Sequence, residues 1–76
     1  MAKMDCRRLA IMLTEARKKL GLSQAALSQR MRPKRSQTWV ARYERGAQQL
    51  TVAEFIGLAH VMGLDPVQVL REVLGK

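Results

Sequence analysis

The sequence predicts an all-α protein, a compact bundle of five short helices that forms a single domain over residues 1–76. Apolar residues recur at spacings of three and four, whereas no stretch alternates between polar and apolar residues as a strand does. Start and stop residues divide the chain into five segments of helical length. A chain of 76 residues is also the size of one small domain.

The first two helices are expected on either side of a glycine stop. The first covers residues 6–20, with Asp5 as a possible cap. Its apolar stripe consists of Leu9, Leu13, Ala16 and Leu20. Gly21 suits the end of this helix because glycine readily adopts the left-handed conformation of a C-terminal cap. The second helix is expected to begin at Ser23, a preferred N-cap residue, and to run to Met31.

The third helix carries different chemistry on its two faces. Pro33 ends the preceding helix, and Ser36 and Gly46 then supply a cap and a terminator. At about 100° per residue, one arc of the wheel holds Gln37, Thr38, Ala41, Arg42 and Arg45. Val40 and Tyr43 point the other way, toward a core. The polar arc contains no carboxylate, a group that the phosphates of DNA would repel.

The fourth and fifth helices have clear start signals. Residues 51–54, Thr-Val-Ala-Glu, form a capping box. The apolar stripe that follows consists of Phe55, Ile56, Ala59 and Met62. Gly63 ends this helix. The fifth helix is expected over residues 65–74, where Asp65 is the N-cap and Pro66 takes the first helical position.

The last helix is apolar over a wider arc than a single core requires. Its apolar side chains cover roughly 160° of the wheel, whereas a helix on one core needs little more than about 100°. The excess predicts a second contact surface, for which Val67, Leu70 and Leu74 are the candidates in a homodimer. The alternative is a helix that leaves one or two valines exposed without further consequence.

Positive charge is concentrated in the first part of the chain. The net charge is +8. Residues 1–29 carry six basic and two acidic side chains, residues 30–45 carry six and one, and residues 46–76 carry two and three. This distribution predicts a polyanionic partner, with nucleic acid as the first candidate. A solvated charged surface without a partner is the alternative.

Several other kinds of protein are not expected. Cys6 is the single cysteine and His60 the single histidine, so neither a disulfide nor a metal site is expected, and no cofactor is implied. The sequence holds no catalytic triad, carboxylate pair or Gly-rich phosphate loop, so an enzyme is not expected. No apolar run could span a membrane and no signal-peptide pattern is found, which predicts a cytoplasmic location.

The second and third helices have the organisation of a helix-turn-helix, whose second helix lies in the DNA major groove. Gln37, Thr38 and Arg42 are the candidates for base contacts, because glutamine suits adenine, arginine suits guanine and the threonine methyl suits thymine. The candidates for contacts with the DNA backbone are Ser23, Gln24, Lys34, Arg35 and Arg45. Trp39 either packs beside Tyr43 or contacts DNA.

Three blocks of sequence carry a family resemblance: ARKKLGLSQAAL at residues 16–27, VARYERG at residues 40–46 and LAHVMGL at residues 58–64. In this order they resemble the Xre-type, lambda repressor/Cro-like helix-turn-helix family. The resemblance implies a small transcriptional regulator, a repressor in the first instance, that binds double-stranded DNA as a homodimer. It also implies base contacts from Gln37, Thr38 and Arg42.

The resemblance further implies roles inside the protein. Arg17 and Glu44 match an ion pair that joins the first helix to the third. Leu27, Val40 and Tyr43 match core positions.

The turn between the second and third helices departs from the family. It is longer than usual, lacks the usual glycine and contains Pro33. We expect this turn to change the angle of the third helix and to place Arg32, Lys34 and Arg35 near phosphates.

Two other functions are compatible with the sequence. An antitoxin-type module would bind a protein partner through the apolar face of residues 65–74, and its DNA binding would be a second, autoregulatory role. A binder of RNA or membrane surfaces driven by charge would show no sequence preference. Against the latter, the capped helices and the amide-bearing face indicate a shaped site.

Overall fold

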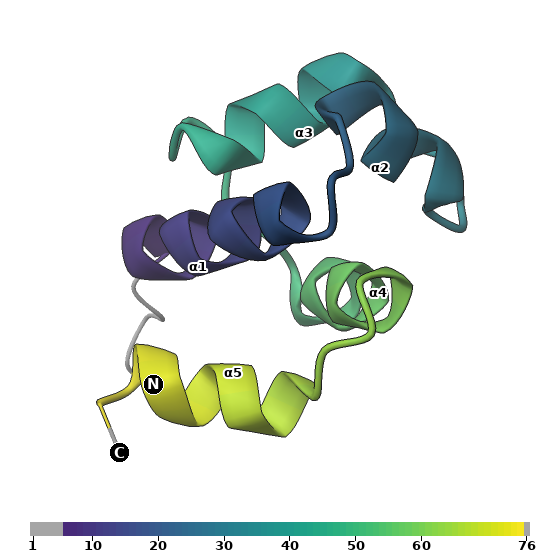
Figure 1. The fold of residues 1–76 in the computed structure, drawn as a ribbon. Coiled ribbons are helices and arrows are strands. Elements are labelled where there is room, and N and C mark those ends of the chain that lie inside the picture. The colour runs from purple at the N-terminus through teal and green to yellow at the C-terminus, as the bar shows by residue number, and fades with distance from the viewer. Residues whose placement is uncertain (1–5, 76) are drawn as a thin grey trace.

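Five helices surround one core in the computed structural model of the chain, which describes residues 6–75 (Figure 1). They are α1 (Cys6–Lys19), α2 (Gln24–Arg30), α3 (Gln37–Glu44), α4 (Val52–Val61) and α5 (Pro66–Val73). The predicted all-α, five-helix fold is therefore confirmed, and the expected cap at Asp5 lies outside the described residues. Within residues 6–75, no helix has the combination of length and apolarity that crossing a membrane requires.

Side-chain caps begin four of these helices. The capping oxygens belong to Ser23, Ser36, Thr51 and Asp65, as the sequence predicts. The capping box of α4 is complete, because the N–H of Glu54 donates to Thr51 Oγ1 (3.1 Å) and the N–H of Thr51 donates to Glu54 Oε1 (2.9 Å). These local bonds satisfy backbone donors that the first turn of a helix leaves open.

The C-terminal end of α3 is fixed by a glycine. Gly46 has a φ of 76°, in the left-handed region that side chains with a Cβ rarely adopt. Its N–H donates to the carbonyl of Tyr43 (3.1 Å), and the N–H of Ala47 donates to that of Arg42 (2.9 Å). This is the Schellman arrangement, and it turns the chain away from α3 toward α4.

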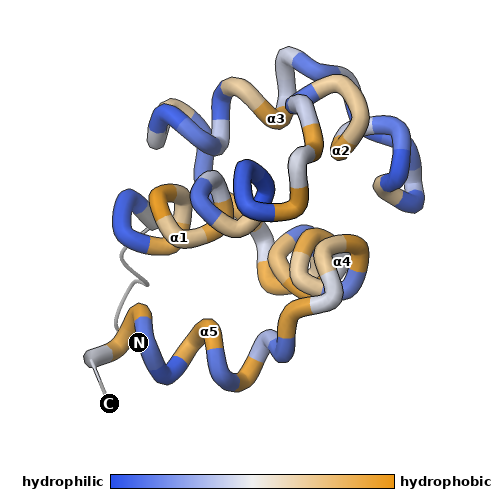
Figure 2. The backbone as a smooth tube through the Cα atoms, viewed as in Figure 1, coloured by the Kyte–Doolittle hydropathy of each residue, from blue (hydrophilic) through white to orange (hydrophobic). Residues whose placement is uncertain are grey.

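The core draws on all five helices. Its largest fully buried side chains are Leu9, Leu13, Leu27, Val40, Tyr43, Phe55 and Leu58. Among the links between helices, the one between α2 and α3 is the most hydrophilic (Figure 2). Val69 and Val73 close the core from α5.

Two residues that the sequence analysis placed on apolar stripes are exposed. Leu20 lies one residue beyond α1, where the chain already turns into its glycine cap, and it is 52% exposed. Ile56 is 47% exposed. The inward stripe of α4 is Phe55, Leu58, Ala59 and Met62, at spacings of three, one and three residues. Ile56 lies about 100° from Phe55 on the wheel, outside this stripe.

The apolar excess of α5 comes from two side chains. Val67 is 57% exposed and Leu74 is 61% exposed, whereas Leu70 packs partly against the core. The outer face of α5 therefore offers Val67 and Leu74 to solvent.

Candidate nucleic-acid interface

Helix α3 lies across the surface of the protein, in contact with α2 and α1 (Figure 1). Val40 and Tyr43 are buried and anchor it to the core. Gln37, Thr38 and Arg42, which the sequence assigned to base contacts, are exposed. The structure thus places these three side chains together on the outer side of an anchored helix.

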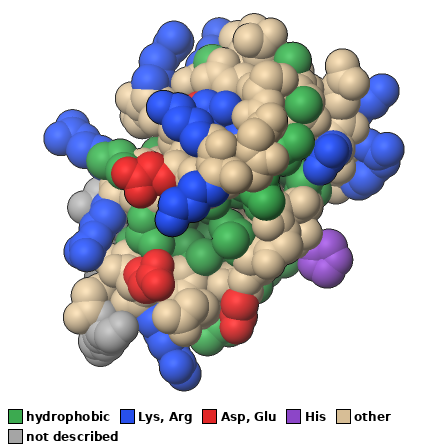
Figure 3. Space-filling view, viewed as in Figure 1, with side chains coloured by type: hydrophobic (Ala, Val, Ile, Leu, Met, Phe, Trp, Pro, Cys, Tyr) green, Lys and Arg blue, Asp and Glu red, His purple; other side chains and the backbone are tan. Residues whose placement is uncertain are grey.

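The surface around α3 is basic. Arg45 directly follows the helix and is exposed, as is Lys34 in the turn before it. In the space-filling view, Lys and Arg side chains crowd the upper part of the molecule, where α2 and α3 lie, and most of the acidic side chains in view lie lower (Figure 3). The one carboxylate of α3, Glu44, is turned inward and is only 7% exposed. The exposed face of α3 therefore carries no negative charge.

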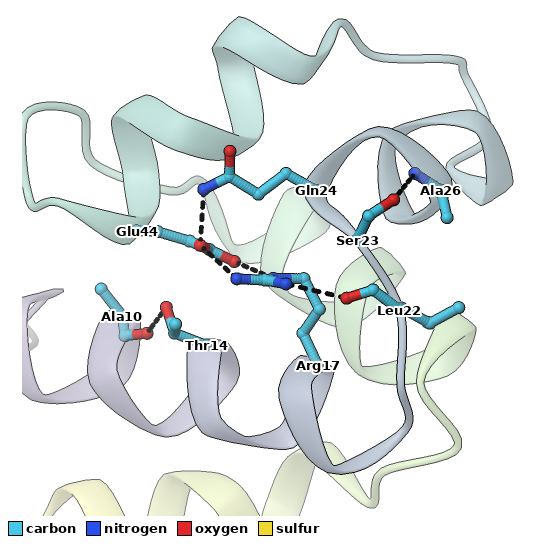
Figure 4. A network of polar contacts seen from close by, with 8 residues as sticks. All are labelled: Ala10, Thr14, Arg17, Leu22, Ser23, Gln24, Ala26 and Glu44. Atoms are coloured by element: carbon cyan, nitrogen blue, oxygen red, sulfur yellow. Dashed lines mark hydrogen bonds and ion pairs between the residues drawn. The ribbon is translucent and has the colours of Figure 1, made fainter.

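Glu44 is held by a polar network between α1, α2 and α3 (Figure 4). The Nε of Arg17 donates to its Oε2 (2.7 Å) and the Nη2 of Arg17 to its Oε1 (3.1 Å). Arg17 Nη1 donates to the carbonyl of Leu22 (2.8 Å). The hydrogen bonds to Glu44 raise the pKa of Arg17 above its ordinary value. This is the helix-joining pair that the family resemblance implies, and its two-pronged geometry fixes the end of α3 against α1.

Gln24 joins this network from the first residue of α2. Its Nε2 donates to Oε1 of Glu44 (2.9 Å), which fixes the direction of the amide. A primary amide nitrogen has two N–H groups, so one remains for another acceptor. The hydroxyl of Ser23 meanwhile accepts the N–H of Ala26 (3.0 Å) as the N-cap of α2.

The basic residues of the α2–α3 turn have different surroundings. Nη1 of Arg32 donates to the carbonyls of Gln29 and Met31, both at 2.8 Å. Nη2 of Arg35 lies 3.3 Å from Oε2 of Glu54, on α4. Lys34 is exposed, and among residues 6–75 no partner of its side chain is found. Two of the three cations that were expected near phosphates thus already have partners within the protein.

Trp39 is half-buried at the side of α3. Its ring lies 5.3 Å from that of Tyr43, between ring centroids, at an interplanar angle of 54°. The guanidinium carbon of Arg35 lies 5.1 Å from the centroid of Trp39, within the range of a cation–π contact. The packing of Trp39 beside Tyr43 is therefore present in the structure, and a contact of Trp39 with DNA stays a prediction.

Glu54 is the residue of this region that the sequence analysis missed. It was assigned only to the capping box, and its contact with Arg35 depends on how α4 packs beside the turn. The local sequence pattern carries no signal for that contact.

Comparison with known proteins identifies the family. The model of the helix-turn-helix domain family matches residues 8–73, so the chain belongs to this family of DNA-binding domains. The fold is similar to that of the restriction-modification controller protein C.AhdI from Aeromonas hydrophila, with a TM-score of 0.74 and 24% sequence identity. The match covers 88% of this chain and 98% of that one. No curated protein sequence gives a significant match.

Proposed function

We propose that the protein is a sequence-specific regulator of transcription that binds double-stranded DNA as a homodimer, with α3 in the major groove. The observation that carries this proposal is the division of α3 into two faces. Gln37, Thr38 and Arg42 are exposed together, while Val40 and Tyr43 are buried. A rigid, anchored helix presents the groups that recognise base edges.

The dimensions and chemistry of α3 suit the major groove. An α-helix with its side chains is about 10–12 Å across, and the major groove is about 12 Å wide. Arg42 suits the two acceptors of guanine, Gln37 suits the acceptor and donor of adenine, and the methyl of Thr38 suits that of thymine. These three side chains are the proposed source of sequence preference.

Groups that flank α3 suit the DNA backbone. Lys34 precedes the helix and Arg45 follows it, and both are exposed. Ser23 and Gln24 lie at the start of α2, where the second N–H of the Gln24 amide is available to a phosphate. Such contacts set the register of a protein on DNA without selecting a sequence.

The charge distribution favours α5 as the dimer interface. Two molecules of charge +8 repel one another least where basic residues are fewest, and residues 46–76 carry two basic and three acidic side chains. Val67 and Leu74 are exposed on this part of the molecule.

We propose repression as the mode of regulation, because a protein that occupies a promoter excludes other proteins without needing a further surface. The fold similarity to C.AhdI, described as a restriction-modification controller protein, supports a regulatory role.

Selection of bound duplexes from a random DNA pool tests the proposal. We expect a two-fold symmetric consensus whose half-sites lie about one helical turn apart. A consensus with a single half-site would contradict the homodimer. Absence of any enriched sequence would contradict sequence-specific binding altogether.

A further inference from the structure

We propose that Arg35, Glu54 and Trp39 form a clamp that sets the angle of α3 on DNA, so that Arg35 and Glu54 are positioning residues rather than DNA contacts. The clamp joins three parts of the molecule: the α2–α3 turn, the first turn of α4 and the side of α3. Its role on DNA rests on the function proposed above, whereas its existence in the free protein can be tested independently.

Glu54 connects the turn to α4 through a single carboxylate. Its Oε1 accepts the N–H of Thr51 (2.9 Å) and so completes the cap of α4. Its Oε2 lies 3.3 Å from Nη2 of Arg35. Because the capping bond already fixes the Glu54 side chain at the start of α4, the ion pair fixes Arg35 relative to that helix.

Arg35 also contacts α3 and α2. Its guanidinium lies over the ring of Trp39, which in turn packs on the buried ring of Tyr43. Its backbone N–H donates to the carbonyl of Ser28 (3.4 Å), at the end of α2. The last residue of the turn before the N-cap of α3 is therefore tied to both neighbouring helices.

The energetics indicate a role in geometry more than in stability. The side chains of Arg35 and Glu54 are 33% and 15% exposed, and a partly solvated ion pair of this kind stabilises a fold little. The Nε of Arg35 is shielded from solvent and has no hydrogen-bond partner among the described residues, which offsets part of the gain. What the clamp supplies is a defined position for the first turn of α3.

The location of the clamp explains why such a restraint is useful. Residues 31–36 link α2 to α3 without regular secondary structure. The backbone hydrogen bond from Arg35 to Ser28 ties this segment to α2, and the side chain of Arg35 ties it to α3 and α4. Gln37 and Thr38 directly follow this segment. A change in the turn would therefore move two of the three proposed base contacts, and recognition requires placement within about 0.5 Å.

The first test uses the fluorescence of Trp39, the only tryptophan of the chain, in the free protein. Glu54→Gln removes the charge that holds Arg35 but keeps the cap of α4, because glutamine also serves at this position of a capping box. Arg35→Gln removes the other partner, and Lys34→Gln is the control with the same loss of charge in the same turn. Circular dichroism verifies that each variant is folded.

We expect the emission of Trp39 to shift to longer wavelength, and acrylamide quenching to increase, in Glu54→Gln and in Arg35→Gln but not in Lys34→Gln. The double variant should behave like either single variant, because both break the same contact. Spectra of Glu54→Gln and Arg35→Gln identical to that of the parent protein would overturn the clamp. This test needs no DNA, so it shows whether the clamp exists even if the proposed function is wrong.

The second test compares affinities for the selected consensus duplex and for a scrambled duplex over a range of salt concentrations. We expect Glu54→Gln to lower the ratio of the two affinities by about 5- to 150-fold, the effect of losing one base contact. In Arg35→Gln the ratio should fall similarly, with the salt dependence unchanged. In Lys34→Gln the slope of log affinity against log salt should become shallower by about 0.9.

A direct phosphate contact from Arg35 predicts the opposite results. Glu54→Gln would then release Arg35 to DNA and tighten binding, and Arg35→Gln would reduce the salt slope as Lys34→Gln does. Either result would overturn the positioning role. A random pool without any enriched duplex would instead contradict the proposed function.

Discussion

Arg17 on α1 and Glu44 at the end of α3 form a two-pronged ion pair, with Nε–Oε2 and Nη2–Oε1 distances of 2.7 and 3.1 Å. Their side chains are only 10% and 7% exposed. The pair removes the one carboxylate of α3 from the exposed face of the helix and fixes the end of α3 to α1. Stability and the charge of the proposed interface therefore depend on the same contact.

Arg17→Met should destabilise the protein strongly, because it leaves the carboxylate of Glu44 buried without its cation. Such losses amount to about 3–5 kcal/mol, against a total of about 4–11 kcal/mol for a domain of this length. Urea unfolding measures the change. The double variant Arg17→Met/Glu44→Leu should be less destabilised than Arg17→Met alone, and a loss below about 1 kcal/mol in Arg17→Met would contradict a buried pair.

Tyr43→Phe should leave stability unchanged or increase it. The hydroxyl of Tyr43 is buried without a hydrogen-bond partner among the described residues, and an unsatisfied polar group costs about 1–3 kcal/mol. Thermal unfolding of the variant measures the effect. A substantially lower unfolding temperature would show that the hydroxyl has a partner, such as a bound water.

Alkaline pH should destabilise the protein through the same residue. Burial raises the pKa of the Tyr43 hydroxyl in the folded state. In the unfolded chain this hydroxyl has a pKa of about 10. Above that pH it therefore ionises in the unfolded chain while it stays protonated in the folded protein. The contribution of this difference in pKa to folding stability is complete below about pH 10 and is lost as the pH rises toward the pKa of Tyr43 in the folded state. Absorbance of tyrosinate should appear together with unfolding, and its appearance while circular dichroism still reports intact helices would contradict the prediction.

Charges on the outer face of α5 should dissociate the proposed homodimer. Val67→Lys and Leu74→Lys place a cation on an apolar contact, where it loses solvation. Sedimentation velocity should report monomers for these variants and dimers for the parent protein. Ile11→Lys is the matched control, because Ile11 is exposed on α1 and the substitution adds the same charge. Equal sedimentation of all four proteins would contradict the α5 interface.

The sequence predicted those parts of the fold that depend on local interactions. Each capped helix start involves residues at most three positions apart. Ser36 and Thr51 can therefore be recognised as N-caps from the local sequence alone. The prediction that Leu20 is buried was wrong because the helical wheel assumes that a helix continues, whereas α1 ends at Lys19. Periodicity does not describe where a chain leaves its helix, and the signal for that end was Gly21.

The candidate site was predictable to the extent that one helix determines it. The exposure of Gln37 and Arg42 follows from the periodicity of α3. The pairing of Arg35 with Glu54 does not, because it depends on how α4 packs beside the turn. Composition describes Arg35 as one of several cations, and only the tertiary structure distinguishes it from Lys34.

Arg45→Ala should weaken DNA binding almost equally on all sequences. Arg45 follows α3 and is exposed, and it is one of the proposed contacts with the DNA backbone. The slope of log affinity against log salt should become shallower by about 0.9, while the preferred sequence stays the same. A changed consensus would instead place Arg45 among the base contacts.

The most direct test of the central claim, that the exposed face of α3 recognises DNA sequence, is the random-pool selection repeated with Arg42→Ala. We expect the sequence preference to be lost at one position of each half-site, at a cost of about 1–3 kcal/mol, while the other positions keep theirs. A consensus identical to that of the parent protein would contradict recognition by α3, as would a loss of affinity that is equal on every sequence.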